Sequence, residues 1–313
     1  MDPLSDVLSL LRPRSFMSGG VDHGGDWAIS FGKYEGIKFQ AVISGGCWLV
    51  VEGMDEPVRI EAGDCYLLPH GRPFHLASDL SLKPVDAYSV LGLPLNGLVR
   101  KINGGGDCLS LGGRFLFEGR HAELLLASLP TIVHLRKESD KAAMRWSVER
   151  LMLELRDPQP GGDIIAQQLA TMMLVQALRL HLSDDAGPGV GWLFALADRQ
   201  MSAAMNAMHA EPGRRWTIES LAERAAMSRS SFALKFKRIV GASPMGYLTR
   251  WRMILAADRL ANGRETISAL APALGYESES AFSTAFKRVM GCAPRHYGRA
   301  GDAQLPALVP AFA

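Results

Sequence analysis

Lysine, arginine and small polar residues recur in two matching series 50 positions apart. Phe236-Lys237-Arg238 in the first series returns as Phe286-Lys287-Arg288 in the second. Cations repeated in this way suit the phosphate oxygens of a nucleic acid, which accept hydrogen bonds from both side chains. The candidate phosphate contacts are Arg229, Lys235, Lys237, Arg238, Lys287 and Arg288. A solvated helix surface is the alternative for each cation, but the repeated Phe-Lys-Arg step weakens it.

Residues two positions from a buried helical residue point to the opposite side of the helix, so each phenylalanine pair defines an outward face. Ser230 and Leu234 face away from Phe232, and Ala233 lies beside them. An apolar Leu234 on a solvent face invites a partner such as a thymine methyl group, and Glu279 can accept a hydrogen bond from a cytosine amine. The candidate base-reading residues are Ser230, Ala233, Leu234, Glu279, Ser280, Ser283 and Thr284.

An internal duplication between Ser220 and Tyr297 supplies the elements that would present these faces. Five positions recur 50 residues later: Phe232, Phe236, Gly241, Pro244 and Tyr247 become Phe282, Phe286, Gly291, Pro294 and Tyr297. Leu221-Ala222 recurs after 49 residues as Leu270-Ala271, so the second copy carries one extra residue in its turn. Each copy predicts a helix-turn-helix unit, a short amphipathic helix followed by a second one.

Capping residues mark the predicted helix ends. Ser228 and Ser278 suit the N-cap of each second helix, and hydroxyls at Thr217, Ser220 and Thr266 stand near the starts of the first helices. Gly241 and Gly291 suit the left-handed residue that ends a helix. The predicted buried residues of the second helices are Phe232, Phe236 and Ile239, then Phe282, Phe286 and Val289. Between the units, Met245–Asn262 predicts one long helix that would space two recognition helices for successive major grooves, about 34 Å apart.

The charge of the 313-residue chain is divided between two regions, although its net value is only +2. Arg214–Arg299 holds 15 Lys and Arg against 6 Asp and Glu, a net +9, whereas the rest holds 19 against 26, a net −7. A basic segment on an otherwise acidic protein is typical of a module that binds a polyanion. Chance clustering of surface charge is the alternative.

The residues before the basic segment predict a different architecture. Up to about Phe117, short apolar or alternating runs separated by glycine predict a β-barrel or sandwich. Apolar residues at helical spacing then predict helices over Asp140–Arg156, Ile164–Leu182 and Ala195–His209. The predicted fold is therefore a two-domain α+β protein: a β-rich first domain, a helical connector, and an all-α second domain with two helix-turn-helix motifs joined by a long helix.

The basic segment resembles the DNA-binding domain of the AraC/XylS family of bacterial transcription regulators. The resemblance rests on Leu221-Ala222, Phe236-Lys237-Arg238, Gly241-x-x-Pro244, Leu274-Gly275-Tyr276, Ser280, Phe282, Phe286-Lys287, Gly291-x-x-Pro294 and Tyr297. In that family, outward residues of both recognition helices contact base edges, which assigns this role to the base-reading candidates above. The first helix departs from the pattern, because Ala233 and Leu234 offer no long polar side chain. DNA shape and phosphate contacts would carry more weight there.

The β-rich domain resembles the cupin-type sensor domain of one branch of the same family. Gly63-Asp64, Leu67-Leu68-Pro69, Gly71 and His75 match the second cupin motif. The first motif, with its His-x-His pair and glutamate, is missing, and Phe39-Gln40 and Trp48 stand in that region. His70 and His75 alone make two candidate ligands, whereas protein zinc sites use three or four. We therefore expect no metal and no cofactor.

Cysteines give the sensor domain a second candidate chemistry. Some cupin-bearing relatives respond to oxidants through cysteines, which makes Cys47, Cys65 and Cys108 candidates by resemblance. Buried inert thiols are the alternative, and an unknown small ligand inside the barrel is another. The sensor candidates are Cys47, Trp48, Cys65, His70, His75 and Cys108.

These observations predict a ligand- or oxidant-responsive transcription regulator and not an enzyme. A cupin-type metalloenzyme with an accessory helical domain and a protein–protein adaptor are the alternatives. The predicted domains are a sensor at 1–120, a connector at 121–190 that could dimerise, the DNA-binding domain at 191–300 and a flexible tail at 301–313. The expected partners are duplex promoter DNA, an unknown effector and a second copy of the chain, with RNA polymerase left open. Four scattered cysteines, no signal peptide and no long apolar run predict a protein of the reducing cytoplasm without membrane association.

Overall fold

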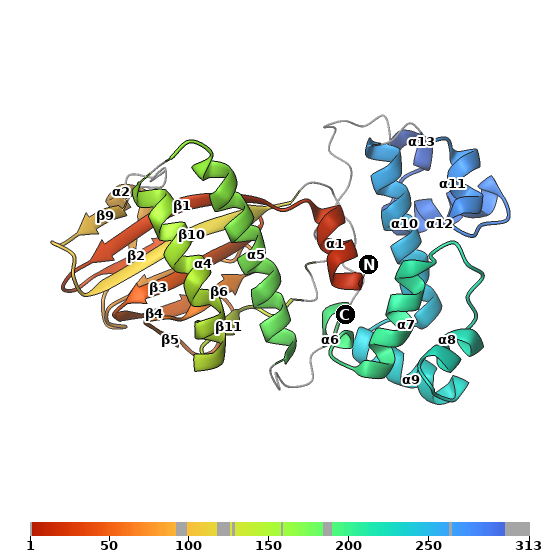
Figure 1. Ribbon diagram of the computed structural model, residues 1–313, viewed down its shortest axis with the longest axis horizontal. Helices are drawn as coiled ribbons and strands as arrows, with labels where there is room; N and C mark the ends of the chain where they lie inside the picture. Colours follow the sequence, from red (N-terminus) through yellow and green to blue (C-terminus); the bar gives the residue numbers. More distant parts are fainter. Residues whose placement is uncertain are drawn as a thin grey trace. The chain divides into compact units, whose positions relative to one another are not determined.

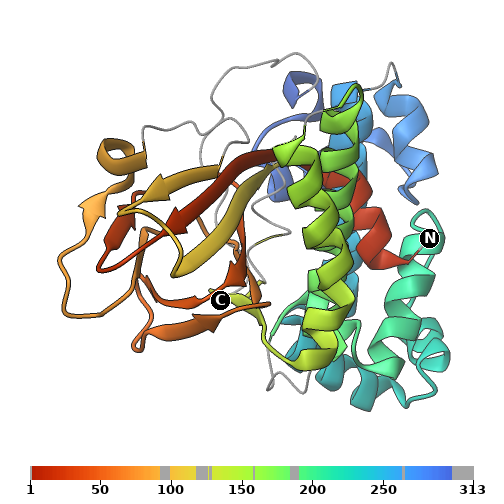
Figure 2. The same cartoon turned by 60° about the vertical axis from the view of Figure 1, so that its left-hand side comes forward.

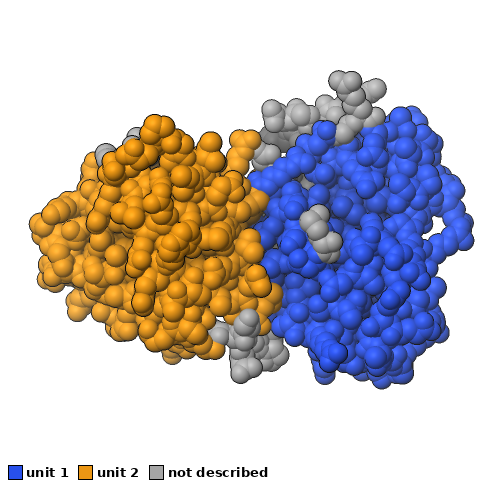
Figure 3. Space-filling view, in the orientation of Figure 1, with its two compact units in different colours: residues 1–12, 119–128, 187–313 blue, residues 13–118, 129–186 orange. Residues whose placement is uncertain are grey.

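The computed structural model describes residues 2–91, 99–117, 126, 129–157, 159–183, 190–262 and 265–297. The chain divides into two units, which Figure 3 colours separately. Unit 1 contains residues 1–12, 119–128 and 187–313, and unit 2 contains residues 13–118 and 129–186. The expected flexible tail at 301–313 lies outside the described residues.

Two β-sheets make up most of unit 2. Among the described residues, the larger sheet has the strand order β11-β6-β3-β10-β1-β9 and the smaller one β5-β4-β7-β2-β8. The larger sheet contains β1 (Arg14–His23), β3 (Ile37–Ser44), β6 (Cys65–Leu68), β9 (Val99–Ile102), β10 (Cys108–Leu116) and β11 (Val133–Leu135). The smaller sheet contains β2 (Ala28–Phe31), β4 (Gly46–Val51), β5 (Val58–Glu61), β7 (Phe74–Ala77) and β8 (Val85–Asp86), which leads into helix α2 (Ala87–Leu91). Neighbouring strands are antiparallel except for the parallel pairs β1–β9 and β2–β8.

The core of unit 2 lies between the inner faces of the two sheets. In β4, Cys47, Leu49 and Val51 are buried while their neighbours are half-buried, because successive side chains point to opposite faces of a strand. All four residues of β6 are buried, which is the pattern of a strand covered on both faces. The predicted β-rich first domain and helical second domain are confirmed.

Helices cover the outer face of the larger sheet. α4 (Glu138–Arg156) and α5 (Gly162–Ser183) run side by side, and α5 packs on β1 and β11 (Figures 1 and 2). These helices belong to unit 2, whereas the sequence analysis placed them in a separate connector at 121–190. They share a unit with the strands because α5 packs on the sheet and α4 packs on α5, which together bury the apolar faces of both helices.

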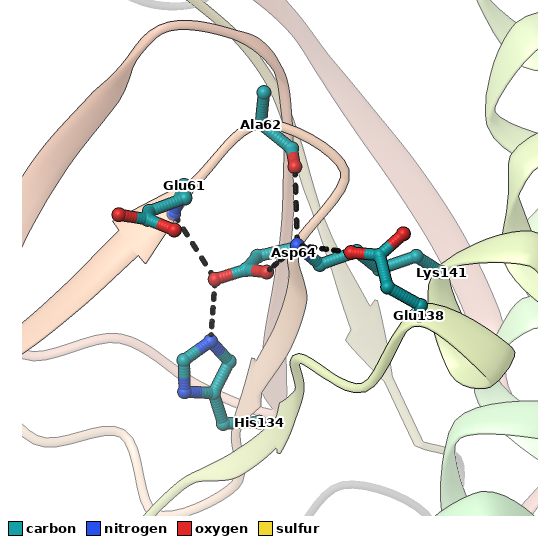
Figure 4. A network of polar contacts seen from close by, with 6 residues as sticks. All are labelled: Glu61, Ala62, Asp64, His134, Glu138 and Lys141. Atoms are coloured by element: carbon teal, nitrogen blue, oxygen red, sulfur yellow. Dashed lines mark hydrogen bonds and ion pairs between the residues drawn. The ribbon is translucent and has the colours of Figure 1, made fainter.

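A buried carboxylate joins α4 to the turn between β5 and β6 (Figure 4). Asp64 Oδ2 accepts hydrogen bonds from the Glu61 backbone N–H at 3.0 Å and from His134 Nε2 at 2.9 Å. Lys141 Nζ lies 3.1 Å from Asp64 Oδ1 and 3.2 Å from Glu138 Oε1. The Gly63-Asp64 pair of the second cupin motif therefore has a structural part here, since its carboxylate is occupied by this network.

Unit 1 is helical. It contains α1 (Pro3–Leu11), α6 (Trp192–Ala195), α7 (Arg199–Ala210), α8 (Ile218–Arg224), α9 (Arg229–Val240), α10 (Pro244–Asn262), α11 (Ile267–Ala273), α12 (Glu279–Met290) and α13 (Pro294–Tyr297). The helix predicted over Ala195–His209 begins later, at Arg199, because Asp198 caps it by accepting hydrogen bonds from the N–H groups of Gln200 and Met201. The separate short helix α6 ends at Ala195. No described helix is both long and apolar enough to cross a lipid bilayer.

The N-terminal helix α1 packs on α7 and belongs to unit 1, although the sequence analysis placed residues 1–12 in the sensor domain. Asp6 Oδ2 lies 3.1 Å from His209 Nδ1, and the other ring nitrogen lies 2.8 Å from the Tyr247 hydroxyl. The ring of His209 also stacks on Trp251 at 4.0 Å. Burial lowers the pKa of His209 to about 3, so the neutral imidazole bridges α1 to α10 through hydrogen bonds.

Candidate nucleic-acid interface

Helices α8 and α9 form the first predicted helix-turn-helix unit. Thr217 and Ser220 close a reciprocal capping box, in which each side chain accepts a hydrogen bond from the other residue's backbone N–H, at 3.2 and 3.0 Å. Ala226, with a φ of 51°, turns the chain between the helices. Ser228 caps α9, and Gly241 ends it with a φ of 79°. The predicted caps of this unit are confirmed.

Helices α11 and α12 repeat this arrangement with two differences. The Thr266 hydroxyl makes no capping bond to the backbone, because it pairs with the Ser268 hydroxyl at 2.8 Å. The turn residue is Gly275, with a φ of 78°, where the first unit has an alanine. Ser278 caps α12, and Gly291 ends it with a φ of 76°. Both recognition helices therefore have the same ends and the same length of 12 residues.

Aromatic residues bury one face of each recognition helix. Phe232 and Phe236 are fully buried with ring centres 5.6 Å apart, and Phe282 and Phe286 repeat this at 5.9 Å. The third buried positions are Val240 and Met290, while Ile239 and Val289, which we predicted to be buried, are half-buried. The helix period allows either position i+7 or i+8 to complete the stripe, and the packing selects i+8. These contacts fix both helices so that the opposite faces point outward.

The long helix α10 lies between the two helix-turn-helix units (Figure 1), and Arg252, a buried arginine on α10, ties it to the loop before α8. Arg252 Nε donates to the Pro212 carbonyl at 2.6 Å, and its Nη2 donates to the Arg214 carbonyl at 2.8 Å. The same guanidinium lies 5.7 Å from the ring of Tyr276, in the turn of the second unit. The sequence analysis missed this role, although an arginine among Trp251, Met253 and the apolar residues that follow was an available signal.

The base-reading candidates lie on the outward faces of α9 and α12. Ser230, Leu234, Glu279, Ser280 and Thr284 are exposed, and Ala233 and Ser283 are half-buried. Leu234 is 74% exposed, which is unusual for a large apolar side chain and marks the centre of the α9 face. The two faces therefore have the accessibility that groove contacts require.

The phosphate candidates divide into three groups. Lys237, Arg238, Lys287 and Arg288 are exposed and form no ion pair with any described residue. Arg229 pairs with Glu219 at 2.9 Å, although both side chains remain exposed. Lys235 is half-buried, where it contacts Asp198 at 2.7 Å and the Gln200 side-chain oxygen at 2.8 Å. Lys235 is thus engaged in fastening α9 to α7 and is a poor phosphate contact.

Comparisons with known proteins agree with this geometry. A cupin family model matches residues 2–183, and a helix-turn-helix domain model matches residues 221–300. A putative AraC-like transcription regulator of Streptomyces lividans is 44% identical over 298 residues, covering 95% of this chain and 98% of the relative. The chain belongs to the AraC family of transcription regulators. A second putative AraC-like regulator, from Streptomyces antibioticus, is 42% identical over the same shares of both chains.

This AraC-type chain is a DNA-binding transcription regulator with a cupin domain before its helix-turn-helix domain. Among solved structures, it is similar to the DNA-binding domain of AdpA in complex with a target DNA. The sequences are 27% identical over 31% of this chain and 87% of that domain, with a TM-score of 0.30.

The structure brings two of the three candidate sensor cysteines of this AraC-type regulator together. Cys47 on β4 and Cys108 on β10 are both buried in the core between the two sheets. The interaction between the two thiols raises the pKa of Cys47 and lowers the pKa of Cys108, and Arg59 also favours the Cys108 thiolate. Cys65 is separate: it pairs in register with Ala41 and Leu135 in the larger sheet, and burial raises its pKa to about 12.

The remaining sensor candidates do not converge on one site. Trp48 lies half-buried on β4, with the guanidinium of Arg59 5.4 Å from its ring. His70 Nε2 lies 2.8 Å from the Leu129 carbonyl, and His75 pairs with Ser30 and Val50 in the smaller sheet. A search of the described residues finds no group of three or more His, Cys, Asp or Glu side chains placed to hold a metal ion. The two histidines are thus bound into the fold at different places.

Proposed function

We propose that this AraC-type regulator reads duplex DNA with the outward faces of α9 and α12, each in a major groove, while exposed cations hold the phosphates. The observation that supports this most is the repetition of one construction. Two 12-residue helices have matching caps, bury matching phenylalanines and leave their opposite faces exposed. A helix whose other face is fixed in this way can present its exposed side chains to base edges in a major groove.

The two helices would divide the work of recognition. Glu279, Ser280 and Thr284 give α12 acceptors and donors for polar base edges. On α9, Leu234 offers an apolar contact, and Lys237 and Arg238 offer charge. We therefore assign direct readout chiefly to α12 and positioning on the backbone chiefly to α9.

Salt dependence tests this proposal with the whole chain. Fluorescence anisotropy compares a labelled fragment of the regulator's own promoter region with a random duplex of equal length at increasing salt. We expect tighter binding to the promoter fragment and a linear fall of log affinity with log salt, with a slope of about −0.9 for each neutralised phosphate. Equal affinity for the two duplexes at physiological salt would contradict sequence-specific reading.

Unit 2 acts, in this proposal, as the sensor that changes DNA affinity, so that the chain works by binding and not by catalysis.

A second copy of the chain is the expected partner of α4 and α5. α4 exposes the large apolar residues Trp146 and Leu153, seven positions apart, and α5 exposes Ile164, Ile165 and Met172. Exposed apolar stripes of this kind are typical of association surfaces. Trp146→Asp is therefore expected to shift sedimentation toward the monomer, and an unchanged profile would remove this surface from the proposal.

An oxidant is one candidate signal for unit 2, and the contact between Cys47 and Cys108 favours it. Hydrogen peroxide would take two electrons and two protons from the two thiols, forming one disulfide and two water molecules. Mass spectrometry of the intact, peroxide-treated chain should show the loss of two hydrogens, and Cys47→Ser should prevent it. Cys65→Ser is the matched control, because Cys65 lies in a different part of the sheet. Equal oxidation of wild type and Cys47→Ser would exclude this pair.

A further inference from the structure

Unit 2 contains a cavity of about 360 Å³ that none of the sensor candidates lines. Residues of β1, β3 and β10 form one wall, and residues of β2, β8, α2 and the segment 32–34 form the other. The volume lies within the range of small-molecule sites, about 300–1,000 Å³. Phe16 and Tyr88 line the cavity and are 46% and 72% exposed, so solvent reaches its mouth.

Two cations at opposed strand positions line this cavity: Lys38 is half-buried and Arg114 is exposed. Lys38 on β3 and Arg114 on β10 are direct cross-strand partners, and both line the cavity. Like charges at directly opposed positions repel, and such pairs are usually avoided in sheets. Neither side chain forms an ion pair with any described residue. Neither cation therefore has a directly paired carboxylate in the described part of the chain.

Aromatic rings surround the lysine. Lys38 Nζ lies 4.7 Å from the centre of the Phe31 ring, 5.5 Å from Phe74 and 5.9 Å from Tyr34. Burial, and then the charge of Arg114, lowers the pKa of Lys38 to about 8. The rings provide a flat apolar wall directly beside the charge, and the charge itself is held where water solvates it poorly.

The other polar groups nearby leave the cavity positive. Lys33 adds a third cation, and Asp86 is the one carboxylate among the described lining residues, its Oδ1 accepting from the Tyr88 N–H at 2.9 Å. Two residues along β3 from Lys38, Gln40 donates to Ser110 at 3.1 Å and accepts from Tyr66 at 2.6 Å. Gln40 is thus satisfied within the sheet, and Lys38 and Arg114 are the two lining cations that strand register places opposite each other.

We propose that this cavity binds a small organic carboxylate, with the carboxylate group between Lys38 and Arg114 and an apolar body against Phe31 and Tyr34. An arginine can take both carboxylate oxygens at once, and the lysine adds a point charge from the opposite strand. The inference rests on the proposal that unit 2 is the sensor, and it names the chemical class of the effector.

The charge of Lys38 gives the site a pH dependence. A bound carboxylate needs the protonated lysine, so affinity should be high at pH 7 and fall as the pH rises through 8. The other charged or titratable groups facing Lys38 are Arg114 from β10, Lys33 and Tyr34 from the adjoining segment, and Asp86 from β8. The pKa of Tyr34 is raised by its burial, so the phenol stays neutral in this range.

The test titrates the full chain at pH 7 with phenylacetate, 2-naphthoate and octanoate, and with the neutral amide of each, by calorimetry. At least one carboxylate should bind ten times more tightly than its amide. Lys38→Met should reduce that affinity at least tenfold while raising the melting temperature of the ligand-free chain, because it keeps the apolar stem and removes an unpaired, half-buried charge. Arg114→Gln should also weaken binding. Lys101→Met, which removes an exposed charge from β9, should leave binding unchanged.

Three results would overturn the inference: equal affinity for carboxylates and amides, unaltered binding by both Lys38→Met and Arg114→Gln, or no binding of any of the three carboxylates at millimolar concentration. DNA affinity of the ligand-free wild type is measured in parallel. Specific promoter binding without carboxylate binding would reject this site alone. Loss of promoter preference would instead reject the proposed reading of DNA.

Discussion

The two helix-turn-helix units have the same backbone construction but present different surfaces. Each recognition helix runs for 12 residues from a serine cap to a left-handed glycine and buries two phenylalanines. On the exposed side, α9 carries Ala233 and Leu234, whereas α12 carries Glu279 and Thr284. The duplication has kept the residues that shape the fold, while the residues free to meet a partner have changed. Two helices that recognise different base pairs need the same backbone geometry and different exposed side chains.

The two helix-turn-helix units also differ in the side-chain contacts beside them. The first is joined to α7 by the half-buried contact between Lys235 and Asp198. Beside the second, the buried guanidinium of Arg252 on α10 donates to the carbonyls of residues 212 and 214 and lies 5.7 Å from the ring of Tyr276. A half-buried ion pair contributes little, whereas buried charged hydrogen bonds contribute more. Arg252 therefore contributes more to the cohesion of unit 1 than Lys235 does.

The largest expected effect tests whether the two cores are equivalent. Phe236→Ala and Phe286→Ala should each lower the free energy of unfolding by about 3–5 kcal/mol, because both rings are fully buried. Urea unfolding followed by circular dichroism measures the loss. Leu234→Ala is the matched control on the exposed face and should change stability by less than about 0.5 kcal/mol. Markedly unequal losses for the two phenylalanines would break the equivalence.

Acid should weaken the contact between His209 of α7 and Tyr247 of α10. His209, which contacts Tyr247, has a pKa of about 3 in the folded chain, against about 6.5 when unfolded. The unfolded chain therefore binds the extra proton between these values, and stability falls as the pH drops through this window, by at most about 1.4 kcal/mol per pH unit. Melting temperatures from pH 7 to pH 4.5 measure the fall.

The variant His209→Gln isolates the histidine in that experiment, because it should flatten the pH dependence. Asp6 acts in the opposite direction, since burial raises its pKa and the folded chain then holds its proton more tightly. An equally steep acid loss in His209→Gln would assign the pH dependence to other groups.

DNA recognition should separate the two helices. Glu279→Ala should change the preferred sequence, with a loss of about 1–3 kcal/mol of discrimination at one base pair. Arg238→Gln should weaken binding to all sequences alike and reduce the salt slope by about 1. Selection of bound fragments from a random pool, with anisotropy at several salt concentrations, measures both. If Glu279→Ala retained the wild-type preference, the assignment of readout to α12 would be wrong.

The turns inside the two helix-turn-helix units, at Ala226 and Gly275, should show the smallest difference in stability. Ala226 adopts a left-handed φ of 51°, which strains an alanine, so Ala226→Gly should stabilise the chain by up to about 1 kcal/mol. Gly275→Ala should do the reverse, because its φ is 78° and a new Cβ would lie 2.5 Å from the Gly213 carbonyl oxygen. Thermal unfolding measures both variants, and a shift of the same sign in each would refute the contrast.

Capping residues in the sequence predicted many of the helix ends in unit 1 correctly. The capping box at Thr217, the serine caps and the terminal glycines each depend on residues within one turn of a helix, which the sequence displays directly. The same signals were present for α1, where Asp2 caps the helix by accepting from the Ser5 N–H at 3.0 Å. Its docking on α7, however, joins residues 203 positions apart in the sequence, as the contact between Asp6 and His209 shows.

The sequence by itself determined the family, the duplicated helix-turn-helix units and their exposed faces, because repeats, caps and helical periods are local properties. Only the tertiary structure placed Lys38 opposite Arg114, brought Cys47 against Cys108, and directed Arg252 onto the carbonyls of residues 212 and 214. The Lys38–Arg114 and Cys47–Cys108 pairs depend on strand register and sheet packing. The bonds of Arg252 depend on the position of a loop whose residue 212 lies 40 positions away in the sequence. Such contacts are set by which distant segments share a core, and no local pattern specifies that.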